Sequence, residues 1–282
     1  MNRLGELSII IVTWKGDDLL RGCLDSLARA VGIAPEIVVV DNAAEESTQK
    51  LVAAYSNTKY VASPGNPGFA GGNNIGLKHT TRDYILLLNN DTVIHTDSFS
   101  PLIDFLDAHP KVGVVQGTMN VPAKGNVLDV CGEDVMPWGL LRHRLIGKPT
   151  ASTPLRAKRV SAAKGALLCL KRQVVAAIGG RLFDPSFKNY FEDIDLCLRA
   201  RNAGWETWFV PTPPIDHLCG QTTAKLNGDE VWVQYFRNIF YSFWKNFGFF
   251  GRFFTLPCFA FAVLIRFPRH FFKALVLLAR QP

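Results

Sequence analysis

The sequence predicts an α/β fold in which a mostly parallel sheet is covered by helices on both faces. Two observations carry this prediction. Short apolar runs rich in β-branched residues recur through the first 110 positions, as expected of parallel strands that are buried on both faces. Segments with helical spacing of apolar residues separate these runs, and such alternation favours a doubly covered sheet. The 282 residues suffice for one large domain with an appendage.

The expected elements follow this pattern along the chain. In the first part, strands are expected at residues 7–14, 36–40, 59–62 and 84–88, and helices at 17–30 and 47–55. Residues 63–76 form a Gly/Pro/Asn-rich loop that leads into a helix. In the second part, the expected elements are a strand at 112–115, a strand pair within 160–170, a helix at 172–178, an amphipathic helix at 191–203 and a strand at 205–210. Residues 120–160 are expected to hold substrate loops or a mobile flap.

The excess positive charge belongs to the end of the chain. The formal net charge is +7, but residues 231–282 contain seven Lys or Arg and no Asp or Glu. The rest of the chain holds 24 basic and 24 acidic residues and is therefore neutral. Because the charge is confined to one segment, we expect a partner for that segment and no nucleic-acid partner for the protein.

Cysteine usage and the start of the chain favour a reducing compartment, the cytoplasm. No two cysteines form a C-x-x-C pair, and all stand in apolar or small-residue settings typical of buried free thiols. The opening MNRLGELSIIIVTW runs directly into a strand pattern, without the apolar region and cleavage site of a signal peptide. The six cysteines are Cys23, Cys131, Cys169, Cys197, Cys219 and Cys258.

Polar residues stand where two predicted strands end. Open α/β sheets bind ligands at the carboxyl ends of their strands. Asp41 could accept hydrogen bonds from a base or ribose, although a turn or helix-capping role is the better explanation of this residue alone. Asn90 and Asp91 follow the strand at 84–88, where a carboxylate could bind a divalent cation that bridges a diphosphate. An Asx turn is the structural alternative there.

Residues 66–74, NPGFAGGNN, point more specifically to a ligand. Small residues that permit close backbone approach stand beside amides that can pair with a base, ribose or phosphate. An ordinary glycine-rich loop before a helix is the structural alternative for any one of these residues.

Two further features could carry chemistry. Glu192, Asp193 and Asp195 open the expected helix at 191–203, where acidic residues suit the helix dipole. A carboxylate at this position that faces a pocket could also act as a general base on a hydroxyl. His217 follows a proline-rich connection, and a lone histidine is more often structural than functional.

Together these segments resemble a known family. The strings IIIVTW, VVVDN, PGNPGFAGGNN, LLLNNDT, FKNYFEDIDLCLRARNAGW and DHLCG occur in the order found in the inverting glycosyltransferases of family 2, which have the Rossmann-like GT-A fold. The bacterial rhamnosyltransferase-like and galactofuranosyltransferase-like members are the most similar. The resemblance covers roughly residues 7–238, and its motifs are weak singly but specific jointly.

The resemblance implies a role for each candidate residue. Asp193 would be the catalytic base, and Asp91 and His217 would bind Mg²⁺ or Mn²⁺. Lys15 and Asn89 depart from the family pattern, in which asparagine and aspartate are frequent at these positions, so a single carboxylate remains for the metal. The residues expected to contact the nucleotide-sugar donor are Thr13, Trp14, Asp41, Asn66, Gly72, Asn73, Asn90, Glu192 and Arg237.

The implied reaction is a single displacement that inverts the anomeric carbon. A dTDP-rhamnose donor is favoured, with UDP-sugars such as UDP-galactofuranose or UDP-glucose as the alternative. The expected acceptor is a lipid-linked or other glycan in cell-surface polysaccharide synthesis. A catalytically inactive sugar-nucleotide-binding scaffold is the rival from another class. A nucleotidyltransferase is disfavoured because no basic glycine-rich loop follows the first strand.

The composition divides the chain into a catalytic domain, residues 1–229, and a helical tail, residues 230–282. Within the domain, the nucleotide-binding half ends near residue 110 and the acceptor half follows it. The segment from residue 231 holds 17 of the 32 aromatic residues, but its longest uncharged apolar run, residues 253–265, is too short to cross a bilayer. Such a segment favours the anionic surface of the inner leaflet. Helices packed on the domain are the structural alternative.

Overall fold

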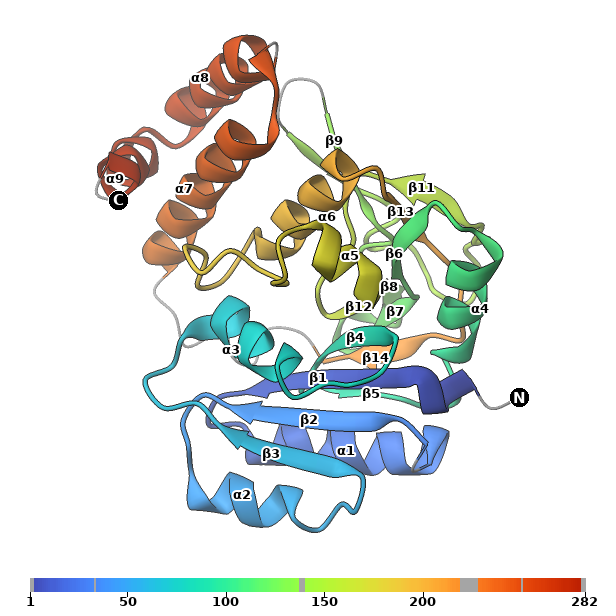
Figure 1. Cartoon of the computed structure of the whole chain (residues 1–282). Helices are drawn as coiled ribbons and strands as arrows, with labels where there is room; N and C mark the ends of the chain where they lie inside the picture. Colours follow the sequence, from blue (N-terminus) through green and yellow to red (C-terminus); the bar gives the residue numbers. More distant parts are fainter. Residues whose placement is uncertain (1–2, 33, 137–139, 219–227, 250, 280–282) are drawn as a thin grey trace.

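The computed structural model describes residues 3–32, 34–136, 140–218, 228–249 and 251–279, arranged around a central sheet (Figure 1). This eight-stranded sheet has the order β11-β13-β6-β12-β4-β1-β2-β3. Only β11 and β12 run against the other six strands, so the predicted mostly parallel sheet is confirmed. The strands are β1 (Leu7–Thr13), β2 (Glu36–Asp41), β3 (Thr58–Ala62), β4 (Tyr84–Asn89), β6 (Val112–Gln116), β11 (Lys158–Val160), β12 (Leu167–Lys171) and β13 (Glu206–Phe209).

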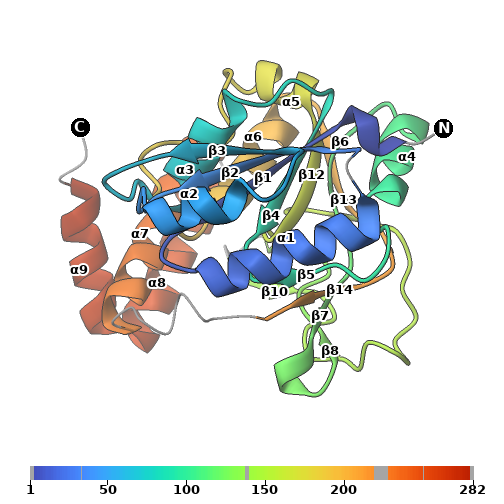
Figure 2. The same ribbon diagram turned by 90° about the horizontal axis from the view of Figure 1, so that it is seen from below.

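Helices cover both faces of the sheet, as predicted (Figures 1 and 2). Successive side chains of a strand point to opposite faces, so Ile9 and Ile11 of β1 enter one core and Ile10 enters the other. The first core is closed by α1 (Asp17–Val31), α2 (Glu46–Val52) and α4 (Ser100–Ala108). The second core is closed by α3 (Gly68–Leu77), α5 (Arg172–Ala177) and α6 (Glu192–Asn202).

The partners of β12 and the presence of α4 differ from the sequence-based expectation. The predicted strand pair within 160–170 is wrong, because β11 pairs with β13, whereas β12 inserts between β4 and β6. The helix α4 was not expected. The Asp97 carboxylate accepts hydrogen bonds from the backbone amides of Phe99 and Ser100 and so stabilises the turn that leads into this helix.

A second, small sheet joins segments that are distant in sequence. Its order is β5-β14-β7-β8, formed by Thr92–Val93, Ile215–His217, Met119–Val121 and Val127–Leu128. The pairing of β5 with β14 sets His217 opposite Thr92. The segment expected to hold loops therefore contains β7, β8, the 3₁₀ turn at Pro122–Lys124, and a hairpin of β9 (Glu133–Val135) and β10 (Leu141–His143).

The helix α7 (Gly228–Asn246) packs against α6 and belongs to the second core, where Phe243 has no exposed surface. A π-helical segment (Gly251–Thr255), α8 (Leu256–Arg266) and α9 (Pro268–Ala279) follow and pack on α7 through aromatic rings, such as Phe240 against Phe259. Among the helices of the described residues, none is both long and apolar enough to cross a bilayer.

The expectation of buried free thiols holds for four of the described cysteines. Cys23, Cys131, Cys169 and Cys197 are buried and unpaired. Cys258 is exposed, because it lies on the side of α8 that faces away from α7, so the expectation is wrong for this residue. Cys219 lies outside the described residues.

Candidate active site

The carboxyl ends of three parallel strands meet at one edge of the sheet. Register pairs Thr13 of β1 with Asp41 of β2, and Val12 of β1 with Asn89 of β4. Because β12 runs in the opposite direction, the chain enters it from this same edge, and the Asn89 amide donates to the carbonyl oxygen of Ala166 at 3.2 Å. Residues that are far apart in sequence are thereby brought together where open α/β sheets bind ligands.

The first strand end is tied to the loop after β4. The side-chain amide of Asn90 donates to Thr13 Oγ1 at 3.0 Å, and Thr13 is buried. Trp14 is half-buried, with Lys15 Nζ 5.8 Å from the centre of its ring. Lys15 is exposed and has a positive φ of 51°, which turns the chain into α1. The structure therefore brings together Thr13, Trp14 and Asn90 from the predicted donor site.

Asp41 is fully buried and stabilises the turn that follows β2. Its carboxylate accepts hydrogen bonds from the amides of Ala43 at 2.9 Å and Glu45 at 2.7 Å, and from the Tyr60 hydroxyl at 3.1 Å. Burial and the Asp41 charge raise the pKa of Tyr60 to about 12, so its hydroxyl stays protonated and donates. These bonds fit the turn role that was the structural alternative for Asp41.

The glycine-rich segment before and within α3 docks on the loop that precedes α6. The amide of Ala70 donates to the carbonyl oxygen of Lys188 at 3.1 Å. Gly68 has a φ of 77°, and a Cβ there would lie 2.4 Å from the same oxygen, so only glycine fits without a shift. The segment thus joins the carboxyl ends of the strands to the loop that precedes α6.

The other predicted members of this segment have different environments. A Cβ on Gly72 would lie 2.7 Å from Val12 Cγ1, so this glycine lets α3 pack closely on β1. Asn73 is buried and donates to the carbonyl oxygen of Phe69 at 2.9 Å. Asn66 is exposed, with a φ of 45°. Of these three residues, Asn66 alone presents its side chain to solvent.

Asp91 and His217 lie side by side at the edge of the small sheet. Asp91 Oδ1 stands 3.4 Å from His217 Nε2, and both residues are buried. Among the described residues, Asp91 Oδ1 has no hydrogen-bond partner. Asn89 Nδ2 is 3.5 Å from the same imidazole nitrogen. The described ranges hold no ready-made cluster of three His, Cys, Asp or Glu ligands, so a cation here would need further ligands from elsewhere.

Two residues beside this pair were missed by the sequence analysis. Asp129 Oδ2 is 2.8 Å from His217 Nδ1, and Lys164 Nζ is 2.8 Å from the same carboxylate oxygen. Although burial opposes its charge, hydrogen bonds from His217 and the Lys164 ion pair hold the pKa of Asp129 well below its ordinary range. No sequence motif marks either residue, because Asp129 lies in the segment expected to hold loops and Lys164 lies within the expected strand pair, where a lone lysine carries no signal.

Asp193 is held at the start of α6 by backbone amides. Its Oδ2 accepts from Gly165 at 2.9 Å and its Oδ1 accepts from Ile194 at 2.8 Å. Burial, followed by the charge of Glu133, raises the pKa of Asp193 to about 6, against the opposing effect of these amides and of Lys164. A carboxylate that titrates near neutrality is suited to take a proton.

The turn into α6 has an unusual backbone. Tyr190 and Phe191 both have positive φ values, 69° and 72°, which bulky residues rarely adopt. Asn238 of α7, fully buried, fixes this turn by donating its side-chain amide to the carbonyl oxygens of Asn189 at 3.0 Å and Tyr190 at 2.7 Å. Backbone strain of this kind clusters at functional sites.

The remaining predicted residues lie around this turn. Glu192 is buried, and burial with the neighbouring Asp193 charge raises its pKa well above the ordinary value. Asp195 has no exposed surface and binds side chains of α6 and α7, including Arg199 at 2.8 Å. Arg237 donates to the carbonyl oxygen of Ser186 at 2.8 Å, so it braces the loop before α6.

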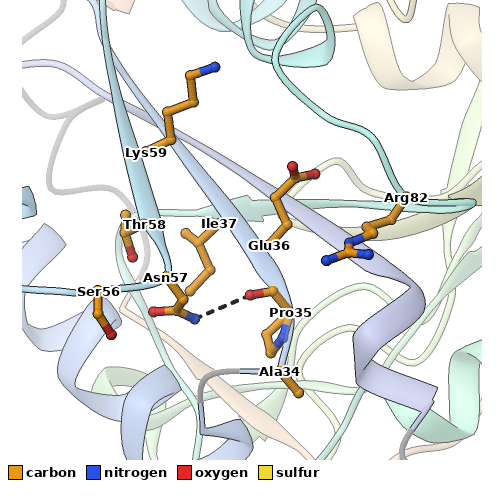
Figure 3. A pocket seen from close by; sticks show the side chains of 9 residues that line it. All are labelled: Ala34, Pro35, Glu36, Ile37, Ser56, Asn57, Thr58, Lys59 and Arg82. Carbon is orange, nitrogen blue, oxygen red and sulfur yellow. Dashed lines mark hydrogen bonds between the residues drawn. The ribbon is translucent and has the colours of Figure 1, made fainter.

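A separate hollow of about 330 Å³ lies at the opposite edge of the sheet (Figure 3). It is lined by the amino-terminal ends of β2 and β3, including Glu36, Ile37 and Thr58. Asn57 closes one side by donating to the carbonyl oxygen of Pro35 at 3.2 Å. Because ligands of open α/β sheets bind at the carboxyl ends of the strands, this hollow is not the candidate site.

Comparisons with known proteins agree with this architecture. The family model "Glycosyltransferase like family 2" matches residues 5–238. The chain is 30% identical over 208 residues to the low-salt glycan biosynthesis hexosyltransferase Agl10 of Haloferax volcanii, a match that spans 70% of this chain and 62% of that protein. It is 24% identical over 245 residues to an N-acetylglucosaminyl-diphospho-decaprenol L-rhamnosyltransferase of Mycobacterium tuberculosis, spanning 78% of each chain.

Solved structures share the fold at low sequence identity. The mannosyltransferase PcManGT from Pyrobaculum calidifontis, in complex with GDP-Man and Mn²⁺, superposes with a TM-score of 0.60 and 16% identity over 97% of this chain and 74% of that chain. Residues 1–349 of S. aureus TarS superpose with a TM-score of 0.62 and 16% identity over 93% and 72% of the two chains. The chain therefore belongs to glycosyltransferase family 2 and has the GT-A fold.

Proposed function

We propose that this chain is an inverting hexosyltransferase that uses a nucleotide-sugar donor, with Asp193 as its general base. One observation carries the proposal. The Asp193 carboxylate accepts a hydrogen bond from the amide of Gly165. The next residue, Ala166, accepts one from the amide of Asn89, which lies two positions before Asp91 in the sequence. A proton acceptor with a pKa near 6 therefore stands at the same sheet edge as the Asp91–His217 pair.

The residues at this edge fit a divalent cation, Mg²⁺ or Mn²⁺. Asp91 supplies a buried oxygen without a hydrogen-bond partner among the described residues, and His217 points Nε2 towards it at 3.4 Å. Two neighbouring ligands of one octahedral ion, each at about 2.1 Å, stand about 3 Å apart. Manganese accepts both carboxylate and imidazole. Such an ion would neutralise charge on the leaving diphosphate. The similar structure of PcManGT was solved in complex with Mn²⁺.

The chain's own residues then account for the transfer. Asp193 takes the proton from an acceptor hydroxyl, whose oxygen attacks the anomeric carbon as the bond to the nucleoside diphosphate breaks. One displacement inverts the configuration. The residues near Thr13 and the loop before α3 would bind the nucleotide. Burial raises the pKa of Glu192, beside the base, and so favours its uncharged form.

For the donor, dTDP-rhamnose is favoured, and a UDP-sugar is the alternative. The Mycobacterium tuberculosis relative is named as a rhamnosyltransferase, and its name also gives a polyprenyl-diphosphate-linked N-acetylglucosamine as its acceptor. A lipid-linked acceptor in cell-envelope glycan synthesis is therefore proposed here.

We further propose that the protein is cytoplasmic and lies on the inner face of the plasma membrane through α8 and α9. These helices pack on α7 on the side turned away from the sheet (Figure 1). Their outer surface exposes large apolar side chains at half or more of their area, among exposed basic residues. On α8 and α9 these are the apolar residues Phe261, Ile265, Phe272 and Val276 and the basic residues Arg266, Arg269 and Lys273, and the preceding π-helical segment adds Arg252, Phe253 and Phe254.

The decisive experiment measures nucleoside diphosphate release with dTDP-rhamnose or UDP-sugars and a polyprenyl-diphosphate-linked N-acetylglucosamine acceptor. Acceptor-dependent release with one donor and an inverted product linkage supports the proposal. Tight donor binding without release under any acceptor and metal condition would instead support the inactive scaffold.

A further inference from the structure

We propose that Asp129 is a positioning residue that fixes His217 with Nε2 towards the metal site and anchors Lys164 beside the base Asp193. The inference rests on the metal site and the base of the proposed function. It goes beyond the proposed function because it assigns to one buried carboxylate, Asp129, the positioning of residues at both the metal site and the base.

The position of Asp129 is fixed by the backbone around it. It follows β8, and its amide donates to the carbonyl oxygen of Met119 at 3.0 Å. Its Oδ1 accepts from the amide of Val130 at 2.7 Å. With 4% of its surface exposed, the carboxylate is held rigidly and shielded from water.

The contact with His217 selects the imidazole tautomer. An ionised carboxylate only accepts hydrogen bonds, so the 2.8 Å contact requires a proton on His217 Nδ1. In the neutral ring the lone pair then lies on Nε2, the nitrogen that stands 3.4 Å from Asp91 Oδ1. Metal-binding histidines are commonly oriented in this way by a carboxylate on their other nitrogen, and loss of that partner costs about 10–100-fold in metal affinity.

The contact with Lys164 reaches the base. Lys164 Nζ lies 2.9 Å and 2.8 Å from the two Asp129 oxygens, and its backbone amide donates to Gln116 Oε1 at 2.8 Å. The next residue, Gly165, donates to Asp193 Oδ2. Asp129 therefore holds the segment that presents both a positive charge and a backbone donor to Asp193.

The first test reads the tautomer in the full chain without ligands. Long-range ¹H–¹⁵N spectra of ¹⁵N-histidine protein, with His217 assigned by its absence in His217→Gln, should show the Nδ1–H form. This measurement needs no Asp129 variant, so it decides the matter even if such variants fail to fold. A His217 ring protonated only on Nε2 overturns the inference.

The second test measures Mn²⁺ affinity by electron paramagnetic resonance, with UDP and separately with dTDP. Asp129→Asn should weaken binding about 10–100-fold, and Asp129→Glu should recover part of the loss. Asp134→Asn is the matched control, because Asp134 also pairs with basic side chains, Arg142 and Arg144, but does not touch His217. Unchanged affinity in a folded Asp129→Asn protein overturns the inference.

A third variant separates the two contacts. Lys164→Met should affect Mn²⁺ affinity less than Asp129→Asn does, while it moves the acid limb of the transfer pH profile upward, because a positive charge near Asp193 is lost. An unmoved acid limb overturns the Lys164 part. If the unaltered protein binds no Mn²⁺ with either nucleotide, the proposed metal site fails, and the tautomer spectrum still decides the role of Asp129.

Discussion

The Asp195 carboxylate of α6 accepts a hydrogen bond from the side-chain amide of Asn246, at the end of α7, at 2.7 Å. The same carboxylate binds Lys245 at 3.1 Å and Arg199 at 2.8 Å, although it has no exposed surface. A buried charge is stable only while its charged and hydrogen-bonding partners stay in place, because the loss of one leaves the charge uncompensated. The helix that begins the predicted tail is therefore joined to the helix that carries the proposed base.

Asp195→Ala should destabilise the protein strongly. Removal of one member of a buried ion pair costs about 3–5 kcal/mol, because the other charges lose their partner. The control is Glu46→Ala, which removes an i,i+4 pair of the same kind between exposed side chains, Glu46 and Lys50, worth about 0–1 kcal/mol. Chemical denaturation of both variants measures the difference, and equal stabilities would show that the network does not hold α7.

Asp193→Asn should abolish most transfer and leave donor binding nearly unchanged. An amide cannot take the acceptor proton, and loss of a general base lowers turnover on the order of 10²–10⁴-fold. Steady-state kinetics with calorimetric titration of the donor separates the two effects. Asp134→Asn serves as the control, because it removes a carboxylate from the neighbouring β9 without touching the base. Near-normal turnover in Asp193→Asn would exclude Asp193 as the base.

The rate of transfer should fall as the pH drops through about 6. The Asp193 pKa is raised to about 6 by burial and by Glu133, and only the deprotonated carboxylate can act as a base. Activity is therefore present above that value and lost below it. Glu133→Gln should move this limb to lower pH, because a negative charge that favours the protonated form is removed. An acid limb near pH 4 in the unaltered protein would contradict the assignment.

Sequence patterns predict some parts of the candidate site, such as the ends of strands, but do not predict contacts between distant segments. The ends of β1, β2 and β4 could be predicted, because apolar strands leave a local signature and Thr13, Asp41 and Asn89 directly terminate them. The contact between His217 and Asp129 could not be predicted. Asp129 reaches His217 only through the pairing within the small sheet, which depends on contacts between distant segments.

Distant contacts also determine the partners of β12 and the packing of α7. A short apolar run does not reveal its partner strands, so the sequence does not predict the insertion of β12 between β4 and β6. Composition groups the aromatic residues of α7 with the tail, because it does not distinguish a helix face buried on α6 from one that faces a membrane. The packing in the structure distinguishes the two kinds of face, since Phe243 of α7 is buried whereas Phe261 of α8 is 65% exposed.

Donor binding should require a divalent cation held by Asp91. Excess chelator should abolish transfer, and added Mn²⁺ or Mg²⁺ should restore it, because the buried Asp91 oxygen otherwise lacks a partner among the described residues. Asp91→Asn should weaken metal-dependent donor binding in calorimetry. Asp18→Asn, at an exposed position in α1, is the control. Full activity in excess chelator would remove the metal from the proposal.

The outer face of α8 and α9 should hold the protein on anionic membranes. Truncation near residue 229 cannot test this, because it removes α7 from the core. Point variants can. Phe261 and Ile265 are 65% and 67% exposed, so Phe261→Ser with Ile265→Ser should leave the fold intact and reduce flotation with anionic vesicles.

Charge should contribute separately from the apolar face. Arg266→Gln, Arg269→Gln and Lys273→Gln each remove about 1 kcal/mol of attraction to an anionic surface, a contribution that salt screens. The triple variant should therefore float less at low salt and lose most of its salt dependence. For the apolar variant of Phe261 and Ile265, the matched control is Ile146→Ser, because Ile146 is 53% exposed but lies outside these helices. If both tail variants float like the unaltered protein, or if neutral vesicles capture the protein equally well, the α8–α9 face is not an anionic-membrane surface.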